Sequence, residues 1–362
     1  MDYASRQSRL KSVLKQNHLN ALLVTHLPNI RYLSGFTGSA AVLLISEKKT
    51  VLFTDGRYKE QARTEVEGAR VIVGRKPALV AAGEWIKAYG KKLGLKMLGI
   101  EAQHMTVAER GQLQRVLRSN PRLREAPPLV EKLRMVKDED EINCLRAAMR
   151  LGSSLFDVAL KLIRPGTREI EVAAEMEYEA RKAGAEGMSF ETIIASGPRS
   201  ALPHGRASAA EIPANGLVVC DFGIILAGYC SDMTRTVHVG KPNVDARKMY
   251  DAVREAQEAA VDRVRPGVSV GEVDQAARKV LTARDLGEYF THSTGHGVGL
   301  EIHEAPRVAR GQHELLRSGM VITIEPGVYV PGAGGVRIED MVVVSESGCE
   351  VLTPTSKELI II

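Results

Sequence analysis

The chain has 362 residues, 44% hydrophobic and 26% charged, which are globular proportions in a length that exceeds one ordinary hydrophobic core. The formal charge of +5 is small, and acidic residues are interleaved with basic ones, which argues against a nucleic-acid-binding surface. No basic segment followed by an apolar run begins the chain and no run of about 18 apolar residues occurs, so we expect a soluble, cytoplasmic protein with no membrane partner.

The first part of the chain alternates predicted helices and strands. Apolar residues have helical spacing over residues 6–19 and 78–89. Short apolar runs predict strands at 21–24, 40–45, 51–54, 71–73 and 97–100. A helix at 78–89 between the last two strands is the order of a βαβ unit, so residues 1–126 are predicted to form an α/β domain.

A punctuated segment separates this domain from the rest of the chain. Pro121, Pro127 and Pro128 interrupt regular structure, and the acidic residues from Asp138 onward mark the first turn of a new helix. We therefore predict a linker at residues 127–136 and a second domain at residues 137–362.

The second domain contains a weak internal repeat. Arg164-Pro165-Gly166 joins two helical stretches, and Arg265-Pro266-Gly267 does the same 101 residues later. Each pair of helical stretches lies next to an apolar hairpin. The matching order of elements favours duplication over a chance match of three residues.

Two predicted hairpins carry acidic residues that face each other. In the hairpin at 217–239, a two-residue turn at Leu226-Ala227 places Asp221 opposite Asp232, with Cβ atoms about 4.5–5.5 Å apart. In the hairpin at 321–344, a turn centred on Gly332 places Glu325 opposite Glu339 by the same reasoning.

These carboxylate pairs require a compensating charge. Like charges directly opposite each other destabilise a sheet, and the apolar runs 217–220 and 321–324 are typical of strands buried on both faces. A buried carboxylate without a partner is costly. The alternative, ordinary acids beside exposed turns, does not explain two such pairs, so the sequence predicts bound divalent cations.

His296 completes the predicted site. It lies between Gly295 and Gly297, where the backbone can approach a ligand closely, although a histidine there would by itself suggest only a structural role. Four carboxylates and one imidazole suit Mn²⁺, Co²⁺, Fe²⁺ or Zn²⁺, and their oxygens are enough to bridge two ions about 3.5–4 Å apart. The four cysteines lack CxxC spacing and are expected to be free thiols.

The motifs of the second domain resemble those of the pita-bread metallopeptidases, in the proline-directed branch that contains Xaa-Pro dipeptidase (prolidase) and aminopeptidase P. The motifs occur in the same order as in that family and cover most of residues 190–345: Pro203-His204-Gly205, Asp221-Phe222-Gly223, Ser231-Asp232-Met233-Thr234-Arg235-Thr236, His292-Ser293-Thr294-Gly295-His296-Gly297, Glu301-Ile302-His303-Glu304, Glu325-Pro326-Gly327 and Arg337-Ile338-Glu339-Asp340.

The first domain is similar to the creatinase-type domain of the same family through residues 29–38 and 54–58. The resemblance implies a creatinase-like α/β domain followed by an α+β pita-bread domain, which has a curved antiparallel sheet and an internal pseudo-two-fold repeat. It also implies a homodimer. Creatinase shares this fold and lacks the metal, whereas all five ligand residues are present here, which disfavours creatine hydrolysis.

The resemblance also implies a role for each site residue. Asp221 would bind one metal ion and Asp232 and Glu339 would bridge two, with His296 and Glu325 on the second ion. Glu325 would also shuttle a proton from the attacking water. His303 would stabilise the oxyanion, His204 would contact the substrate near the scissile carbonyl, and His292 would accommodate the proline end. Arg337 would either support a carboxylate ligand or contact the substrate carboxylate.

The function implied is hydrolysis of Xaa-Pro bonds in short peptides with two divalent ions, Mn²⁺ being the expected metal. A dipeptidase is favoured over an aminopeptidase P because bacterial aminopeptidases P tend to be longer at the amino terminus. Two other readings stay open: a metal-free peptide-binding module on the same fold, and a methionine aminopeptidase, which usually lacks an amino-terminal domain of this size. Assaying Ala-Pro against Ala-Pro-Ala separates the dipeptidase from the aminopeptidase P, metal analysis tests the binding module, and activity on Met-Ala peptides would favour the methionine aminopeptidase.

Overall fold

The chain forms two compact units, Met1–Arg134 and Met135–Ile362, in a computed structural model that describes residues 1–118 and 120–362. The expected linker at 127–136 contains helix α6 (Leu129–Arg134). Helix α6 packs within the first unit, where Arg134 Nη1 donates to Asn29 Oδ1 at 2.8 Å. Regular structure therefore continues to the boundary between the units.

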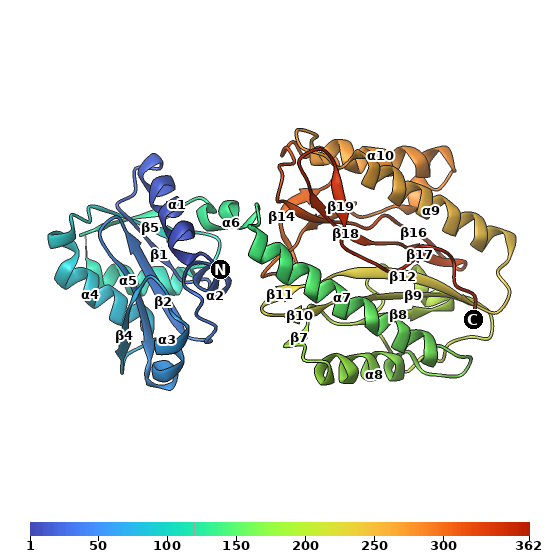
Figure 1. Ribbon diagram of the computed structural model, residues 1–362, viewed down its shortest axis with the longest axis horizontal. Coiled ribbons are helices and arrows are strands. Elements are labelled where there is room, and N and C mark those ends of the chain that lie inside the picture. The colour runs from blue at the N-terminus through green and yellow to red at the C-terminus, as the bar shows by residue number, and fades with distance from the viewer. Residues whose placement is uncertain (119) are drawn as a thin grey trace. The chain divides into compact units, whose positions relative to one another are not determined.

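The first unit is built on a six-stranded mixed sheet in the order β4-β3-β2-β1-β5-β6 (Figure 1). Strands β1, β2 and β3 are antiparallel neighbours, whereas β4, β5 and β6 join the sheet in parallel. The expected α/β class is confirmed, although β4 and β5, which flank the predicted helix, are not adjacent in the sheet. The elements are α1 (Tyr3–Gln16), β1 (Ala21–Val24), α2 (Leu27–Ser34), β2 (Ala41–Ser46), β3 (Thr50–Asp55), η1 (Gly56–Tyr58), α3 (Lys59–Glu65), β4 (Arg70–Gly74), α4 (Ala78–Leu93), β5 (Met97–Glu101), α5 (Val107–Leu117) and β6 (Arg122–Ala126).

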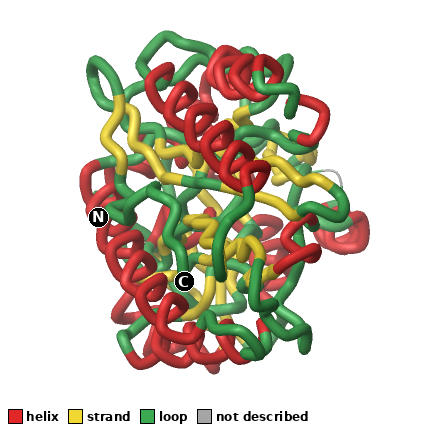
Figure 2. The backbone as a smooth tube through the Cα atoms, turned by 90° about the vertical axis from the view of Figure 1, so that its right-hand side faces the viewer, coloured by secondary structure: helices red, strands yellow, loops and turns green. Residues whose placement is uncertain are grey.

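The second unit places antiparallel strands between two pairs of helices, α7–α8 and α9–α10 (Figures 1 and 2). Adjacent side chains of one strand enter different cores: Val321 packs with α7 and α8, and Ile322 packs with α9 and α10. This alternation explains the uninterrupted apolar runs, because both faces of the strands are buried. The helices are α7 (Glu139–Leu162), α8 (Glu169–Lys182), α9 (Val244–Arg263) and α10 (Val270–Ala283).

Four sheets make up the strand layer of this unit, and every strand pair in them is antiparallel. The sheets are β12-β9-β8, β11-β10-β7, β14-β13-β15-β18-β19 and β16-β17. Their strands are β7 (Gly187–Met188), β8 (Ile193–Ser196), β9 (Gly216–Phe222), β10 (Ile224–Leu226), β11 (Tyr229–Cys230), β12 (Met233–Val239), β13 (Gly295–Gly297), β14 (Glu304–Val308), β15 (Val321–Ile324), β16 (Gly327–Val330), β17 (Gly334–Arg337), β18 (Asp340–Val344) and β19 (Cys349–Val351); the 3₁₀ turns are η2 (Gly197–Ala201) and η3 (Gly287–Tyr289).

The internal repeat is confirmed by matching backbone hydrogen bonds at the two Arg-Pro-Gly turns. Gly166 has φ +85° and donates to Ile212 O at 2.9 Å, and Gly267 has φ +82° and donates to Leu316 O at 2.9 Å. The returning bonds match too, since the N–H of residue 212 bonds to the carbonyl of 167 and that of 316 bonds to the carbonyl of 268, each at 2.9 Å. Three shared residues therefore mark a duplicated helix-turn-helix structure.

The predicted register of the first hairpin is wrong by two residues. Asp221 pairs with Thr234, not with Asp232, and Leu226 pairs with Tyr229. The turn is Ala227-Gly228, with φ values of +50° and +81°. A two-residue turn of this type needs positive φ at both central positions, and glycine meets that requirement at the second one. Centring the turn on Leu226-Ala227 left Gly228 in a strand, where its special conformation has no use.

The predicted register of the second hairpin is correct. Val321 pairs with Val343 and Gly327 with Arg337, so pairing before and after residues 325 and 339 keeps one register. Gly332 has φ +81° at the centre of the loop. Glu325 and Glu339 belong to neither ladder and lie between them, where the strands pass from one sheet to the other.

All four cysteines are free thiols, as expected. Across residues 1–118 and 120–362, no helix combines the length and the apolar character needed to cross a lipid bilayer.

Candidate metal centre

The five candidate ligands line one cavity of about 730 Å³ in the second unit. Asp221 lies near the end of β9, Asp232 immediately before β12, and His296 in the middle of β13. Glu325 and Glu339 lie at the two crossings between sheets. Four other predicted site residues line the same cavity: His204, His292, His303 and Arg337. Sequence positions more than 130 residues apart thus meet in a single site.

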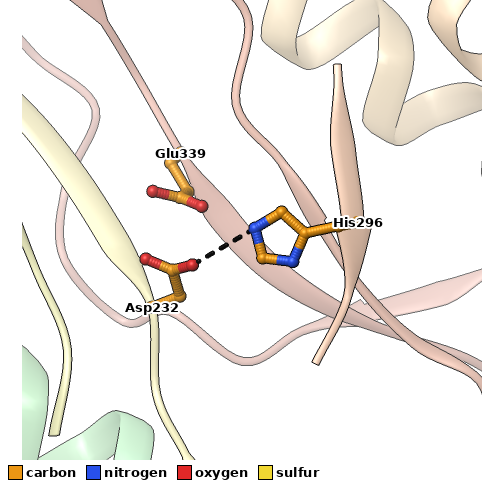
Figure 3. Close-up of side chains that lie close together, drawn as sticks. All are labelled: Asp232, His296 and Glu339. Atoms are coloured by element: carbon orange, nitrogen blue, oxygen red, sulfur yellow. Dashed lines mark ion pairs between the residues drawn. The ribbon is translucent and has the colours of Figure 1, made fainter. Parts of the chain in front are cut away.

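Three of these ligands form a tight group. Asp232, His296 and Glu339 each present one ligand atom, and these atoms all lie within 4.8 Å of one another. Figure 3 shows the three side chains pointing toward one another from three separate segments. His296 Nε2 lies 3.5 Å from Asp232 Oδ2 and 3.3 Å from Glu325 Oε1, so Glu325 belongs to the same cluster.

The carboxylates of the group are buried and repel one another. Asp232 and Glu339 are 4% and 2% exposed. Burial, followed by the charges of Glu339, Asp221 and Glu325, raises the pKa of Asp232 well above its usual range. Burial and the neighbouring carboxylates raise the pKa of Glu339 in the same way. Burial raises the pKa of Glu325 to about 8, although the nearby Arg337 opposes the shift. A bound cation would relieve this repulsion.

His296 is suited to ligate a metal as a neutral imidazole. Burial lowers its pKa to about 4, so it is uncharged at neutral pH. Its Nδ1 lies 2.9 Å from the carbonyl oxygen of Gly297, which assigns the ring proton to Nδ1 and leaves the lone pair of Nε2 facing Asp232 and Glu325. A lone pair facing two carboxylate oxygens is repulsive unless a cation lies between them. The residues present therefore fit a divalent metal.

Asp221 provides a second indication that a cation binds in this cavity. It is 8% exposed, its Oδ2 accepts a short hydrogen bond from Arg337 Nη2, and its Oδ1 is buried with no hydrogen-bond partner among the described residues. Asp221 lies outside the tight group of three but lines the same cavity. A buried carboxylate oxygen without a donor is costly, and a cation supplies the missing partner.

Arg337 holds the site rather than projecting toward a substrate. It is 3% exposed, and besides Asp221 it donates to Thr234 Oγ1 at 3.2 Å and to the carbonyl oxygen of Pro203 at 3.0 Å. Its other partner is the hydroxyl of Tyr329. Of the two roles considered from the sequence, these contacts support the one in which Arg337 orients a carboxylate ligand.

Tyr329 connects Arg337 to His292, and the sequence analysis missed it. The Tyr329 hydroxyl lies 2.9 Å from His292 Nε2, while His292 Nδ1 lies 2.8 Å from the carbonyl oxygen of Ser293. Arg337 therefore donates to Tyr329, which donates to His292. Burial, with help from Arg337, lowers the pKa of His292 to about 4 and keeps it neutral. Only its contacts with Arg337 and His292 identify this tyrosine, since no sequence pattern around it is distinctive.

His303 and His204 lie at the accessible side of the cavity. The rings of His303 and His296 have centroids 4.5 Å apart and meet edge to face. Burial, followed by the nearby His204, lowers the pKa of His303. Both His303 and His204 are exposed residues, as expected of groups that meet a substrate.

Arg307 is a second residue that the sequence analysis missed. It lies on β14 directly opposite His296 and lines the cavity. Its side chain is exposed and makes no hydrogen bond or ion pair with the described residues. The other exposed cation of the cavity, Arg206, is paired with Glu191 at 2.9 Å. Arg307 follows His303 by only four residues, but only the strand pairing and the lining of the cavity show that it reaches the site.

Comparison with known proteins gives one family for each unit. Residues 143–346 match metallopeptidase family M24, and residues 6–136 match the Creatinase/Prolidase N-terminal domain. The chain is 39% identical to the Xaa-Pro dipeptidase of Pyrococcus horikoshii over 96% of each chain. Its structure is similar to that of an Xaa-Pro dipeptidase from Bacillus anthracis, with a TM-score of 0.95 and 40% identity over 99% of this chain and 100% of that one. An X-Pro aminopeptidase from Thermotoga maritima is also similar, with a TM-score of 0.89 and 35% identity over 99% and 100% of the two chains.

Proposed function

The chain belongs to metallopeptidase family M24 and carries the Creatinase/Prolidase N-terminal domain, and from this premise we propose that it is a metal-dependent exopeptidase that hydrolyses Xaa-Pro dipeptides. The observation that carries the proposal is the buried cluster of carboxylates around a neutral imidazole, which fits divalent cations and little else. Two relatives, one compared by sequence and one by structure, are both named Xaa-Pro dipeptidase and match nearly the whole chain.

We assign the five ligands to two metal ions, with two of the carboxylates shared between the ions. Asp221 would hold one ion, Asp232 and Glu339 would bridge, and His296 with Glu325 would hold the other. Ions of this type lower the pKa of water and polarise a carbonyl group. Mn²⁺ is the expected metal, and Co²⁺, Zn²⁺ or Fe²⁺ would accept the same mixture of oxygen and nitrogen ligands.

The remaining residues would position the peptide and move its protons. Glu325 would accept the proton of the attacking water and pass it to the leaving proline nitrogen, because its carboxylate faces the cavity beside His296. His303 would donate to the oxygen that gains negative charge, and His204 would contact the scissile carbonyl. His292 would lie at the proline end. The homodimer that the resemblance implies stays a prediction.

Arg307 supports a dipeptidase over an aminopeptidase. In a dipeptide the carboxylate lies next to the scissile bond, whereas in a longer peptide that place is taken by a neutral amide. An exposed guanidinium without an internal partner, opposite the ligand His296, is available to bind this carboxylate. Arg337 already binds Asp221 and Tyr329, and Arg206 already pairs with Glu191. Both are therefore less available than Arg307 to bind the substrate carboxylate.

The substrate assignment predicts a clear preference in a peptide panel. With added Mn²⁺, we expect kcat/KM for Ala-Pro to exceed that for Ala-Pro-Ala by at least about tenfold, the effect of one charged hydrogen bond. Release of proline and of amino-terminal alanine measures the two reactions. Turnover of the tripeptide alone would point to an aminopeptidase, and turnover of Met-Ala would point to a methionine aminopeptidase. A purified protein without metal that binds peptides and cleaves none would point to a binding module.

Replacement of Arg307 tests how the dipeptide is recognised. We expect Arg307→Met to raise KM for Ala-Pro by about 10–100-fold with little change in kcat, because a charged hydrogen bond of about 1.5–3 kcal/mol is lost from binding. The amide Ala-Pro-NH₂, which lacks the carboxylate, should be turned over equally by both proteins. Arg310→Met, at an exposed residue three positions further on, is the matched control. An unchanged KM for Ala-Pro in Arg307→Met would exclude Arg307 as the carboxylate partner.

A further inference from the structure

The main chain around Glu339 is not held by a sheet. Glu339 lies between β17, which pairs with β16, and β18, which pairs with β15 and β19. Ladder hydrogen bonds therefore end on both sides of this residue. Its N–H donates to the carbonyl oxygen of Thr234 at 3.1 Å, and its Oε2 accepts from Thr234 Oγ1 at 2.7 Å. Strand β12 thus supplies the contacts that a ladder partner would otherwise make.

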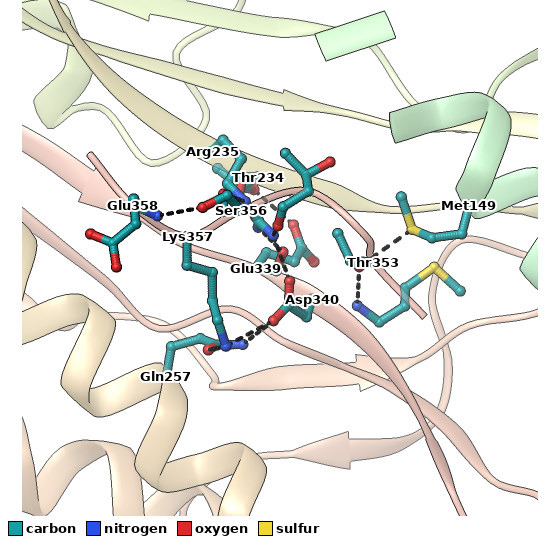
Figure 4. Close-up of polar contacts among 12 residues, drawn as sticks. Met149, Thr234, Arg235, Gln257, Glu339, Asp340, Thr353, Ser356, Lys357 and Glu358 are labelled. Atoms are coloured by element: carbon teal, nitrogen blue, oxygen red, sulfur yellow. Dashed lines mark hydrogen bonds and ion pairs between the residues drawn. The ribbon is translucent and has the colours of Figure 1, made fainter. Parts of the chain in front are cut away.

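Arg235, the next residue of β12, completes this hold on Glu339. Its Nη1 donates to the carbonyl oxygen of Glu339 at 2.6 Å and to that of Thr234 at 2.9 Å. Its Nη2 donates to Asp340 Oδ1 at 2.7 Å and to Thr355 O at 2.6 Å, and its Nε donates to Ser356 O at 2.9 Å. Figure 4 shows Arg235 within this group of polar contacts, together with Thr234, Glu339 and Asp340. All five of its N–H donors are used.

Asp340 holds Arg235 in place. Both side chains are almost fully buried, with exposed fractions of 1% and 2%. Besides Arg235, Asp340 accepts from Gln257 Nε2 at 2.9 Å and lies 3.3 Å from Lys357 Nζ, so both of its oxygens have partners. Because successive residues of an extended chain point to opposite faces, Asp340 faces this polar group while Glu339 faces the cavity.

We propose that Arg235, locked by Asp340, is a positioning residue that fixes the Glu339 carboxylate in the metal centre. The inference rests on the proposed function, in which Glu339 bridges two ions. Glu339 has other carboxylates as neighbours, and repulsion from them would favour its displacement from the cluster in the absence of a cation. Hydrogen bonds hold the N–H and the carbonyl oxygen of Glu339 and the side chain of the next residue, Asp340, and these bonds resist that displacement. The ligand is therefore in place before the metal binds.

A plainer role for the same contacts would be to attach the segment after β19 to the sheet. Arg235 also binds the carbonyl oxygens of Thr355 and Ser356, and Lys357 reaches Asp340. Under that role, loss of Arg235 would lower the thermal stability and leave the metal affinity of the folded protein unchanged. Metal affinity therefore distinguishes the two roles, and stability alone does not.

The deciding variant is Arg235→Lys, measured with the full-length protein. Lysine keeps the positive charge and offers three donors from one atom, so it cannot span five acceptors. We expect the Kd for Mn²⁺, titrated into metal-free protein, to rise by about 10–100-fold at one or both sites. We also expect kcat for Ala-Pro at saturating Mn²⁺ to fall by about tenfold, with KM within threefold of the wild type. Asp340→Asn should shift both quantities in the same direction by a smaller factor.

Two controls separate positioning from stability. Val253→Ala removes volume from the buried core of α9 and should lower Tm without changing the Kd for Mn²⁺. Arg146→Lys alters an arginine that binds Glu139 and Glu350 at the surface, and it should change neither quantity. If Arg235→Lys does not fold, Asp340→Asn decides the question by the same measurements.

An unchanged Kd and kcat in the folded variants would overturn the inference, even if Tm falls. That result is distinct from failure of the proposed function, in which the wild-type protein itself would bind no Mn²⁺ or would not hydrolyse Ala-Pro.

Discussion

Asp232→Asn is expected to lower kcat/KM for Ala-Pro by at least about 10³-fold, or more than 4 kcal/mol of transition-state stabilisation. Asp232 belongs to the tight group with His296 and Glu339, its Oδ2 lies 3.5 Å from His296 Nε2, and it is proposed to bridge the two ions. Asparagine keeps the shape but removes the negative charge and one of the two ligand oxygens. Steady-state kinetics and metal content per chain measure the loss, and fewer than two Mn²⁺ ions should remain.

The same variant should behave in the opposite way when metal is absent. Removing one like charge from a buried cluster of carboxylates relieves repulsion, so metal-free Asp232→Asn should unfold at a higher temperature than metal-free wild type. Higher stability together with lost activity shows that the variant has not simply misfolded. Asp285→Asn is the matched control, because Asp285 is exposed with φ +57°, a conformation that asparagine tolerates. Wild-type activity in Asp232→Asn would remove this carboxylate from the catalytic site.

Removal of metal should abolish activity and make stability strongly dependent on pH. The folded-state pKa values of Asp232, Glu325 and Glu339 are raised, that of Glu325 to about 8. A carboxyl group with a raised pKa stabilises the fold fully below its unfolded pKa of about 4, and this contribution is lost as pH rises through the folded value. Metal-free protein should therefore lose stability steadily between about pH 5 and pH 8.

Bound cations should remove most of that loss. At a concentration of about 100 times Kd, a ligand stabilises the folded state by about 2.7 kcal/mol, which is about 5–10 °C in Tm for a unit of this size. We expect the difference in Tm between samples with Mn²⁺ and with chelator to widen from pH 5 to pH 8. Parallel curves would contradict the carboxylate cluster as the metal site. Metal-by-metal restoration of Ala-Pro hydrolysis after chelation identifies the ion that the protein prefers.

The two hairpins show how far local sequence determines pairing. The second register was predicted correctly because Pro331 and four neighbouring residues, three of them glycines, confine the turn. The first was wrong because the turn was placed one residue too early, which shifts every pair by two. The error did not change the prediction that Asp221 and Asp232 face the same site, because a shift of two residues preserves the face of the sheet on which each side chain lies. Asp232 itself lies between β11 and β12, so the position of its side chain also depends on the irregular segment that joins these two strands.

The residues that support the site were harder to predict than its ligands. The five candidate ligands were predicted because carboxylates and a histidine are chemically unusual in apolar or glycine-rich surroundings, whereas His204, His292 and His303 were predicted only from the family resemblance. Arg307, Tyr329 and the pair Arg235–Asp340 were not assigned, although two of them lie within quoted motifs. Each is related to the site by a contact with another segment: Arg307 pairs with His296 across two strands, Tyr329 contacts His292, and Arg235 donates to a carbonyl oxygen 104 residues away.

Sequence by itself predicted the two-domain organisation, the duplicated helix pairs, the apolar strands buried on both faces and a candidate metal site among four acidic residues. These follow from local periodicity, turn chemistry and the cost of burying like charges, all of which can be read along a single segment. Tertiary structure alone decided which oxygens face His296, that Arg337 binds Asp221, and that Arg235 donates to the backbone of Glu339. Such contacts join separate segments of the chain, and their geometry is fixed by how the four sheets and four long helices of the second unit pack, which no local pattern encodes.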